Sequence, residues 1–158
     1  MLSNSVFVLC ATNFLKKRKA MKIKIDHLED LHMEAQNEEG GKIRMDGATE
    51  IGGLEGGFSP MQLLLAGIGG CSAVDIIGIL EKQKQPLEDL QVIVDGDKQS
   101  TGTYSEFKTI RLNFIFTGNL EEKKVKRAID LSLEKYCSVS KALEKGSKIS
   151  YSYKIQNN

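Results

Sequence analysis

Two cysteines are the residues in this sequence best suited to chemistry. The chain has three, Cys10, Cys71 and Cys137, and local patterns place the last two on predicted helices. These two lie 66 positions apart, which does not match the close Cys-x-x-Cys spacing of zinc sites. The spacing therefore favours a dithiol redox pair, and we expect no metal and no cofactor.

Cys71 lies in a strongly apolar stretch that contains Gly67, Gly69 and Gly70. Three glycines in a helix interior cost about 2–3 kcal/mol relative to alanine. Something must offset that cost, either a backbone packed closely against the helix or a substrate that needs room beside the sulfur. The alternative is that Cys71 is an inert, small core side chain.

Cys137 precedes Ser138 and Ser140 at the predicted start of a helix. Free backbone N–H groups and the helix dipole stabilise a thiolate there, so we expect the pKa of Cys137 to fall. The alternative is that Cys137 only caps the helix.

Other titratable residues lie close to the cysteines or near the N-terminus. Asp75 lies one helical turn after Cys71, where an ionised carboxylate would disfavour a thiolate. Its alternative role is that of a hydrogen-bonded carboxylate in the core or at an interface. His27 and His32 have no ligand partner at metal-site spacing, so we expect both at a surface or sheet edge.

The elements that must position these residues begin with short strands. Alternation predicts a strand over 21–27 and a hairpin over 31–35 and 42–48, followed by a mobile glycine-rich loop over 52–57. Ser59 and Pro60 then mark the start of a helix whose residues 61–74 carry no charge. A helix that is apolar on every side belongs in a core, and it needs more cover than two hairpins provide, so we expect a homodimer. The uncharged stretch is shorter than a membrane span.

The second half of the chain alternates in the same way. We expect paired strands over 87–94 and 104–116, an amphipathic helix over 120–136 with a solvated charged face, a short helix from 137 to 146, and a last strand over 149–155. This order of elements is typical of an α+β fold.

Composition limits the class of protein. With 158 residues, 27% of them charged, and a net charge of +1, the chain suits one domain and offers no basic field for nucleic acid. Three cysteines do not form the framework of a secreted domain, which favours a reducing cytoplasm. In residues 1–20 the apolar run precedes the cations, the reverse of a signal peptide. We expect 1–20 to be an extension outside the core, with Met21 as a possible true start, and 21–158 to be a single domain.

Two motifs point to a known family. The run Ser-Pro-Met-Gln-Leu-Leu-Leu-Ala over 59–66, with Cys71 eleven residues after the proline, and the run Lys-Tyr-Cys-Ser-Val-Ser-Lys-Ala-Leu over 135–143 resemble the OsmC/Ohr family of osmotically inducible and organic hydroperoxide resistance proteins. The likeness covers about residues 21–156. It implies an α+β fold in which antiparallel sheets wrap a central apolar helix and two chains intertwine as a homodimer.

The same resemblance implies an activity, which is thiol-dependent reduction of organic or hydrogen peroxides in oxidative stress defence. Cys71 would attack the peroxide and become a sulfenic acid, Cys137 would resolve it to a disulfide, and a dithiol reductant would regenerate the pair. In the peroxidase branches a glutamate follows the motif proline and engages an arginine of the N-terminal hairpin. Here Met61 takes the glutamate position, and Arg44 lies a few residues beyond the arginine position. We take Arg44, Met61, Gln62 and Asp75 as supporting residues.

Two other functions remain open from the sequence. In the first, the fold is kept, the thiols are spectators, and an apolar cavity beside Gly67 to Gly70 binds a small hydrophobic or electrophilic ligand. In the second, a thioesterase-like enzyme uses Asp75 as its base.

Overall fold

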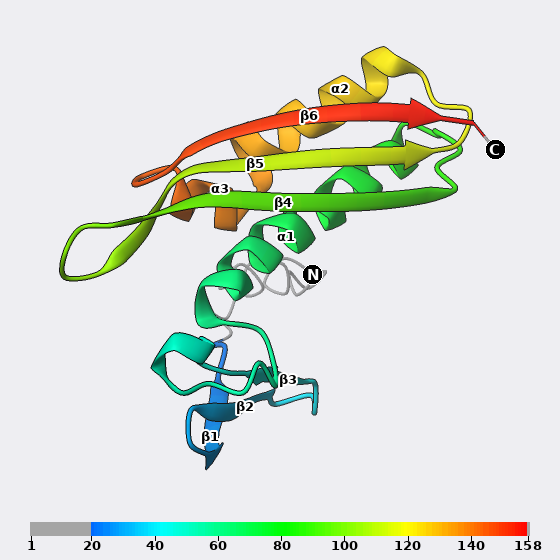
Figure 1. Ribbon diagram of the computed structural model, residues 1–158. Helices are drawn as coiled ribbons and strands as arrows, with labels where there is room; N and C mark the ends of the chain where they lie inside the picture. The colour runs from blue at the N-terminus through cyan, green and yellow to red at the C-terminus, as the bar shows by residue number, and fades with distance from the viewer. Residues whose placement is uncertain (1–19, 158) are drawn as a thin grey trace, which may run out of the picture. The chain divides into compact units, whose positions relative to one another are not determined.

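The computed structural model describes residues 20–157, and these form two compact units, 20–57 and 58–157. The predicted extension over 1–20 falls almost entirely outside the described residues. Figure 1 shows the helices and strands of both units.

The N-terminal unit is a three-stranded antiparallel meander, as the alternation predicts. Its strands are β1 (Ile23–Glu29), β2 (His32–Asn37) and β3 (Lys42–Met45), in the order β1-β2-β3. A 3₁₀ turn, η1 (Thr49–Ile51), follows. The buried Asp46 carboxylate accepts hydrogen bonds from the N–H groups of Gly47, Leu54 and Gly56, so one side chain organises much of the predicted glycine loop.

The C-terminal unit places three helices on one face of a three-stranded sheet (Figure 1). The elements are α1 (Pro60–Lys82), β4 (Asp89–Ser100), β5 (Ser105–Thr117), α2 (Glu122–Leu131), a π-helical turn η2 (Ser132–Tyr136), α3 (Ser138–Leu143) and β6 (Lys148–Gln156). Together with the first unit this is a mixed α+β fold, as predicted.

The α1 helix begins where the sequence indicates. Ser59 is the N-cap: its side chain accepts from Gln62 N, and the Gln62 side chain accepts from Ser59 N, so the two form a capping box ahead of Pro60. The helix runs for 23 residues, longer than its uncharged part, and by length and composition alone it could cross a membrane. Its packing against β4 and α2 identifies it as the core helix.

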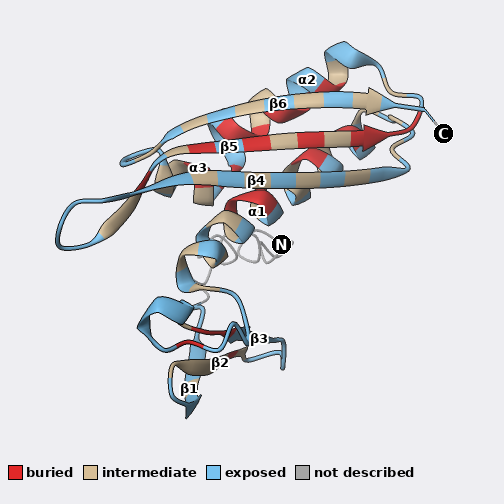
Figure 2. Ribbon diagram, in the orientation of Figure 1, coloured by how far each residue is buried: buried red, intermediate tan, exposed pale blue. Residues whose placement is uncertain are grey.

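The core lies between this helix and the sheet (Figure 2). Alternate residues of β5 point inward from Ile110 onward, namely Ile110, Leu112, Phe114 and Phe116, and Phe107 joins the same core beyond a bulge. Ile68, Ile76 and Leu80 of α1 meet them and are fully buried. Within one chain α1 is not buried on every side, because the side that carries Val74 and Ile77 remains exposed, by 72% and 45% at these two residues.

One strand differs from the predicted antiparallel sheets. β4 pairs with β5 antiparallel, but β6 pairs with β5 in parallel. The chain leaves β5 at Thr117 and crosses the helical face through α2, η2 and α3 before it enters β6. That crossover returns the chain to the end of the sheet where β5 starts, which forces the parallel direction.

Candidate functional site

The two sulfurs of the predicted pair lie close together. Sγ of Cys71, Sγ of Cys137 and a carboxylate oxygen of Asp75 are all within 4.8 Å of one another. Cys71 comes from the middle of α1, and Cys137 from the junction of η2 and α3, both of which contact α1. The arrangement brings together two free thiols from distant parts of the chain.

Cys137 is the N-cap of α3, as the sequence predicts. Its Sγ accepts a hydrogen bond from Ser140 N at 3.3 Å, and its own N–H donates to Ser132 O at 2.8 Å. The predicted fall in its pKa is wrong. Cys137 is fully buried, and desolvation raises the pKa of its thiol by more than the Ser140 N–H bond lowers it.

Asp75 is a hydrogen-bonded carboxylate, which is the alternative role predicted for it from the sequence. Ser132 Oγ donates to Asp75 Oδ2 at 3.2 Å, and it also lies 3.4 Å from the carbonyl oxygen of Ser72. Ser132 is fully buried on the π-helical turn. Sequence reasoning missed Ser132, because a π-helical turn leaves the apolar pattern of the surrounding helix unchanged.

The glycines beside Cys71 have different roles. A Cβ on Gly69 would lie 2.9 Å from Cγ2 of Val94, so this glycine lets β4 approach the helix. A Cβ on Gly70 would meet nothing within 4 Å. Close packing therefore explains Gly69, although the neighbour is a side chain of β4 and not a second backbone, while Gly70 has open space beside it.

Cavities adjoin α1 on two sides. One of about 560 Å³ is mainly apolar, and Gly69, Gly70 and Val94 help to line it. The second, of about 710 Å³, reaches Asp75. Its lining is Asp75, Gly78, Ile79, Lys82, Gln83, Arg127, Leu131 and Tyr136.

The second cavity carries charge and an unused polar atom. Cys71, Asp75, Gly78 and Lys82 follow one another along a single face of α1, at intervals of four, three and four residues. Lys82 and Arg127 bring two positive charges to the cavity. Within residues 20–157, the buried Gln83 Oε1 lacks a hydrogen-bond partner. The spacing of Lys82 from Cys71 could have indicated from the sequence that both lie on one face of the helix. Arg127 could not be found in this way, because the charged face of α2 was interpreted as solvated.

The other predicted residues have contacts of their own. Met61 packs at the edge of the core from the first turn of α1, and Gln62 completes the capping box. Arg44 is exposed on β3 in the N-terminal unit, where its Nε lies 3.9 Å from Glu34 Oε2. His27 is exposed as expected. His32 is not at the surface, because its side chain is only 12% exposed and lies 3.9 Å from Asp46.

Comparison with known proteins agrees with this geometry. Residues 52–152 match the family model described as OsmC-like protein. The chain belongs to the OsmC-like family. It is 37% identical over 136 residues to Protein YhfA of Escherichia coli strain K12, covering 85% of this chain and 98% of YhfA.

Solved structures show the same OsmC-like fold. A hypothetical protein from Aquifex aeolicus VF5 has a TM-score of 0.78 at 26% identity, covering 89% of this chain and 98% of that one. An organic hydroperoxide resistance protein OsmC from Legionella pneumophila has a TM-score of 0.69 at 21% identity, covering 87% of this chain and 98% of its own. Membership of the family indicates a peroxide-related redox role.

Proposed function

We propose that this OsmC-like protein reduces organic hydroperoxides through Cys71 and Cys137. The observation that carries the proposal is the approach of the two sulfurs to within 4.8 Å. The Cys71 thiolate attacks the outer oxygen of the hydroperoxide, the O–O bond breaks, and the alcohol leaves with a proton. The resulting sulfenic acid is attacked by Cys137, water leaves, and a disulfide forms. A dithiol reductant returns both thiols.

The difference in burial between the two cysteines supports the roles proposed for them. Cys71 is partly exposed and Cys137 is fully buried. Because desolvation raises the pKa of Cys137, that residue stays a thiol until a sulfenic acid forms beside it. Cys71 is therefore the attacking residue and Cys137 the resolving one.

The cavity that reaches Asp75 supports a preference for substrates with an anionic group. Lys82 lies about 16 Å beyond Cys71 along the axis of α1, since each residue of a helix rises 1.5 Å. A hydroperoxide whose carboxylate met Lys82 and Arg127 would extend along the cavity toward the thiols. The two cations then select the substrate and take no part in the redox step.

We also propose that a second copy covers the exposed side of α1. Ala66, Gly70, Val74 and Ile77 lie at spacings of four, four and three residues, and all are exposed. Small residues at two of these positions let another helix approach closely, and Val74 and Ile77 would gain burial. Sedimentation of the full chain should give a dimer, and Val74→Glu should dissociate it. A wild-type monomer would contradict this assembly.

Thiol mapping tests the activity. Reduced protein carrying Cys10→Ser is treated with graded cumene hydroperoxide or hydrogen peroxide, and mass spectrometry then locates each remaining thiol. We expect both thiols to be lost together and one disulfide to join Cys71 to Cys137 within a chain. Cys71→Ser should leave Cys137 reduced, whereas Cys137→Ser should trap a sulfenic acid on Cys71. Retention of both thiols under excess organic hydroperoxide would refute the activity.

The apolar cavity beside Gly70 favours a second candidate, which is binding of a small hydrophobic ligand with the thiols as spectators. Fluorescence titration with an apolar dye separates the two functions. Under the second, Cys71→Ser binds the dye as wild type does, and neither protein consumes peroxide. Peroxide consumption that is lost with Cys71→Ser would decide against it.

A further inference from the structure

The cluster of Cys71, Asp75 and Cys137 offers three potential metal ligands in one place. Each residue supplies one donor atom, and the three atoms lie within 4.8 Å of one another. All three residues belong to the C-terminal unit. The long sequence separation of the cysteines hid this set, because the fold and not the local spacing brings the donors together.

Two sulfurs and one oxygen suit zinc. Zn²⁺ binds thiolate sulfur at about 2.3 Å and carboxylate oxygen at about 2.0–2.2 Å, usually with tetrahedral geometry. Tetrahedral ligands at those bond lengths lie about 3.4–3.8 Å from one another. The three donor atoms, at most 4.8 Å apart, therefore need to move together by only about 1 Å. A disulfide requires the sulfurs to approach to about 2.05 Å, which is a larger movement.

Neighbouring groups donate hydrogen bonds to two of the three donor residues, as is common in zinc sites. Ser132 Oγ donates to Asp75 Oδ2 at 3.2 Å. Ser140 N donates to Cys137 Sγ at 3.3 Å. Hydrogen bonds of this kind orient metal ligands and favour their deprotonated forms.

The charge balance also fits. When a divalent cation binds, each thiol releases its proton to solvent, and the two thiolates with the Asp75 carboxylate give the bound ion a net charge of about −1. Binding should therefore strengthen as pH rises.

We propose that the reduced protein binds one Zn²⁺ ion per chain through Cys71, Asp75 and Cys137. Asp75 lines the 710 Å³ cavity, and a water or a small ligand entering there completes the coordination. The ion ties up both sulfurs and so protects the thiols from oxidants. This proposal does not depend on peroxide turnover, since it needs only the reduced thiols and the geometry.

Cobalt titration tests the site directly. Reduced full-length protein carrying Cys10→Ser is titrated with Co²⁺ under anaerobic conditions, and absorbance from sulfur-to-cobalt charge transfer is followed. We expect saturation at one equivalent per chain and displacement of the cobalt by Zn²⁺. Cys71→Ser and Cys137→Ser should each lose most of the charge-transfer absorbance.

Substitution of Asp75 distinguishes a three-ligand site from chelation by the two thiols alone. Asp75→Asn keeps the shape and the Ser132 hydrogen bond, and it should weaken Zn²⁺ binding at least tenfold while both thiolates still bind cobalt. The matched control is Glu134→Gln, an exposed carboxylate on η2, which should leave the affinity unchanged. Circular dichroism confirms that each variant is folded. Charge-transfer absorbance no stronger than in Cys71→Ser, or affinity unaffected by Asp75→Asn, would overturn the proposal.

Discussion

Oxidation of Cys71 and Cys137 to a disulfide should stabilise the folded protein by an amount that depends on the length of chain between them. A disulfide between Cys71 and Cys137 closes a loop of 66 residues. The loss of entropy in the unfolded chain then contributes about 4 kcal/mol at 25 °C. Two native-state costs reduce this gain: the sulfurs must move together from up to 4.8 Å apart, and the Ser140 N–H bond to Cys137 Sγ is weakened. We expect a net gain of about 2–4 kcal/mol in the free energy of unfolding.

Guanidinium unfolding of the reduced and the hydroperoxide-oxidised protein measures this gain. Both samples carry Cys10→Ser, and the control is Cys71→Ser treated in the same way, whose stability should not change. Mass mapping confirms that the bond lies within a chain. An oxidised protein that unfolds at the same or a lower guanidinium concentration would refute the reasoning, because the sulfurs would then pair only at the cost of the native fold.

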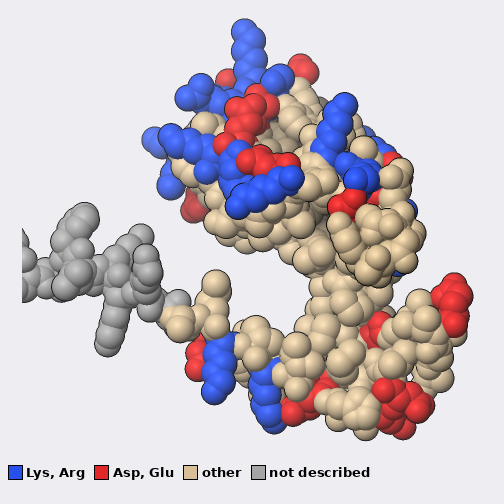
Figure 3. Space-filling view, turned by 90° about the vertical axis from the view of Figure 1, so that its left-hand side faces the viewer, with Lys and Arg blue, Asp and Glu red and all other residues tan. Residues whose placement is uncertain are grey.

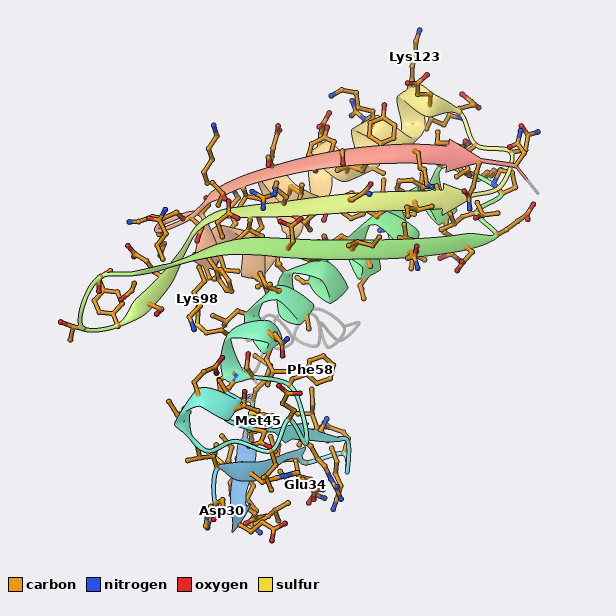
Figure 4. All side chains as sticks on the ribbon, viewed as in Figure 1. Asp30, Glu34, Met45, Phe58, Lys98 and Lys123 are labelled. Atoms are coloured by element: carbon orange, nitrogen blue, oxygen red, sulfur yellow. The ribbon has the colours of Figure 1, made fainter. Side chains whose placement is uncertain are left out.

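Three further predictions concern selectivity, packing and pH. Arg127→Gln should raise KM for a carboxylate-bearing hydroperoxide about fivefold and leave KM for cumene hydroperoxide unchanged. The control is Lys123→Gln, which should change neither KM because the Lys123 side chain points away from the fold (Figure 4). Gly69→Ala should lower the free energy of unfolding in urea by about 1–2 kcal/mol, because the new Cβ meets Val94 at 2.9 Å. Gly78→Ala has open space around it and should raise that free energy by up to about 1 kcal/mol. Equal effects of the two substitutions would contradict the packing argument. Backbone hydrogen bonds, that of Gly56 first, lower the pKa of Asp46, so its stabilisation is complete above about pH 4 and is lost as pH falls through the lowered value. Asp46→Asn should remove that pH dependence from hydrogen exchange of the Leu54 and Gly56 amides, and an unchanged acid response would contradict it.

The Arg127 prediction depends on a local feature and not on the general charge of the surface. Figure 3 shows many Lys and Arg side chains over the C-terminal unit, with Asp and Glu among them. Exposed pairs such as Lys126 with Asp130 and Lys141 with Glu144 contribute little to stability. Arg127 and Lys82 differ because they line the cavity that reaches Asp75.

Much of the fold was predictable because local chemistry decides it. The Ser59-Pro60 pair specifies where α1 begins, and alternation specifies the strands on either side of it. The direction of β6 was not predictable in this way, since Ile149, Tyr151 and Tyr153 alternate identically in a parallel or an antiparallel pair. Direction comes from the crossover through α2 and α3, which is a property of the whole topology.

The site was predictable in its two cysteines and Asp75, but not in its other members or in its electrostatics. The sequence patterns selected Cys71, Asp75 and Cys137, and these three lie together. The predicted helix-terminus effect on Cys137 failed because burial, a tertiary property, outweighs one N–H hydrogen bond. Similarly, His32 is buried because Asp46 and the loop at Gly56 fold over it, which no feature of its neighbouring residues indicates.

The parallel pairing of β6 with β5 affects the order in which the chain gains its reactivity. The β4–β5 ribbon needs only local contacts, whereas β6 must wait until the 30 residues that separate it from β5 have docked. Cys137 belongs to that segment, so we expect its sulfur to meet Cys71 only after the crossover has packed against α1. Reactivity of the thiol pair would then report that the whole C-terminal unit has folded.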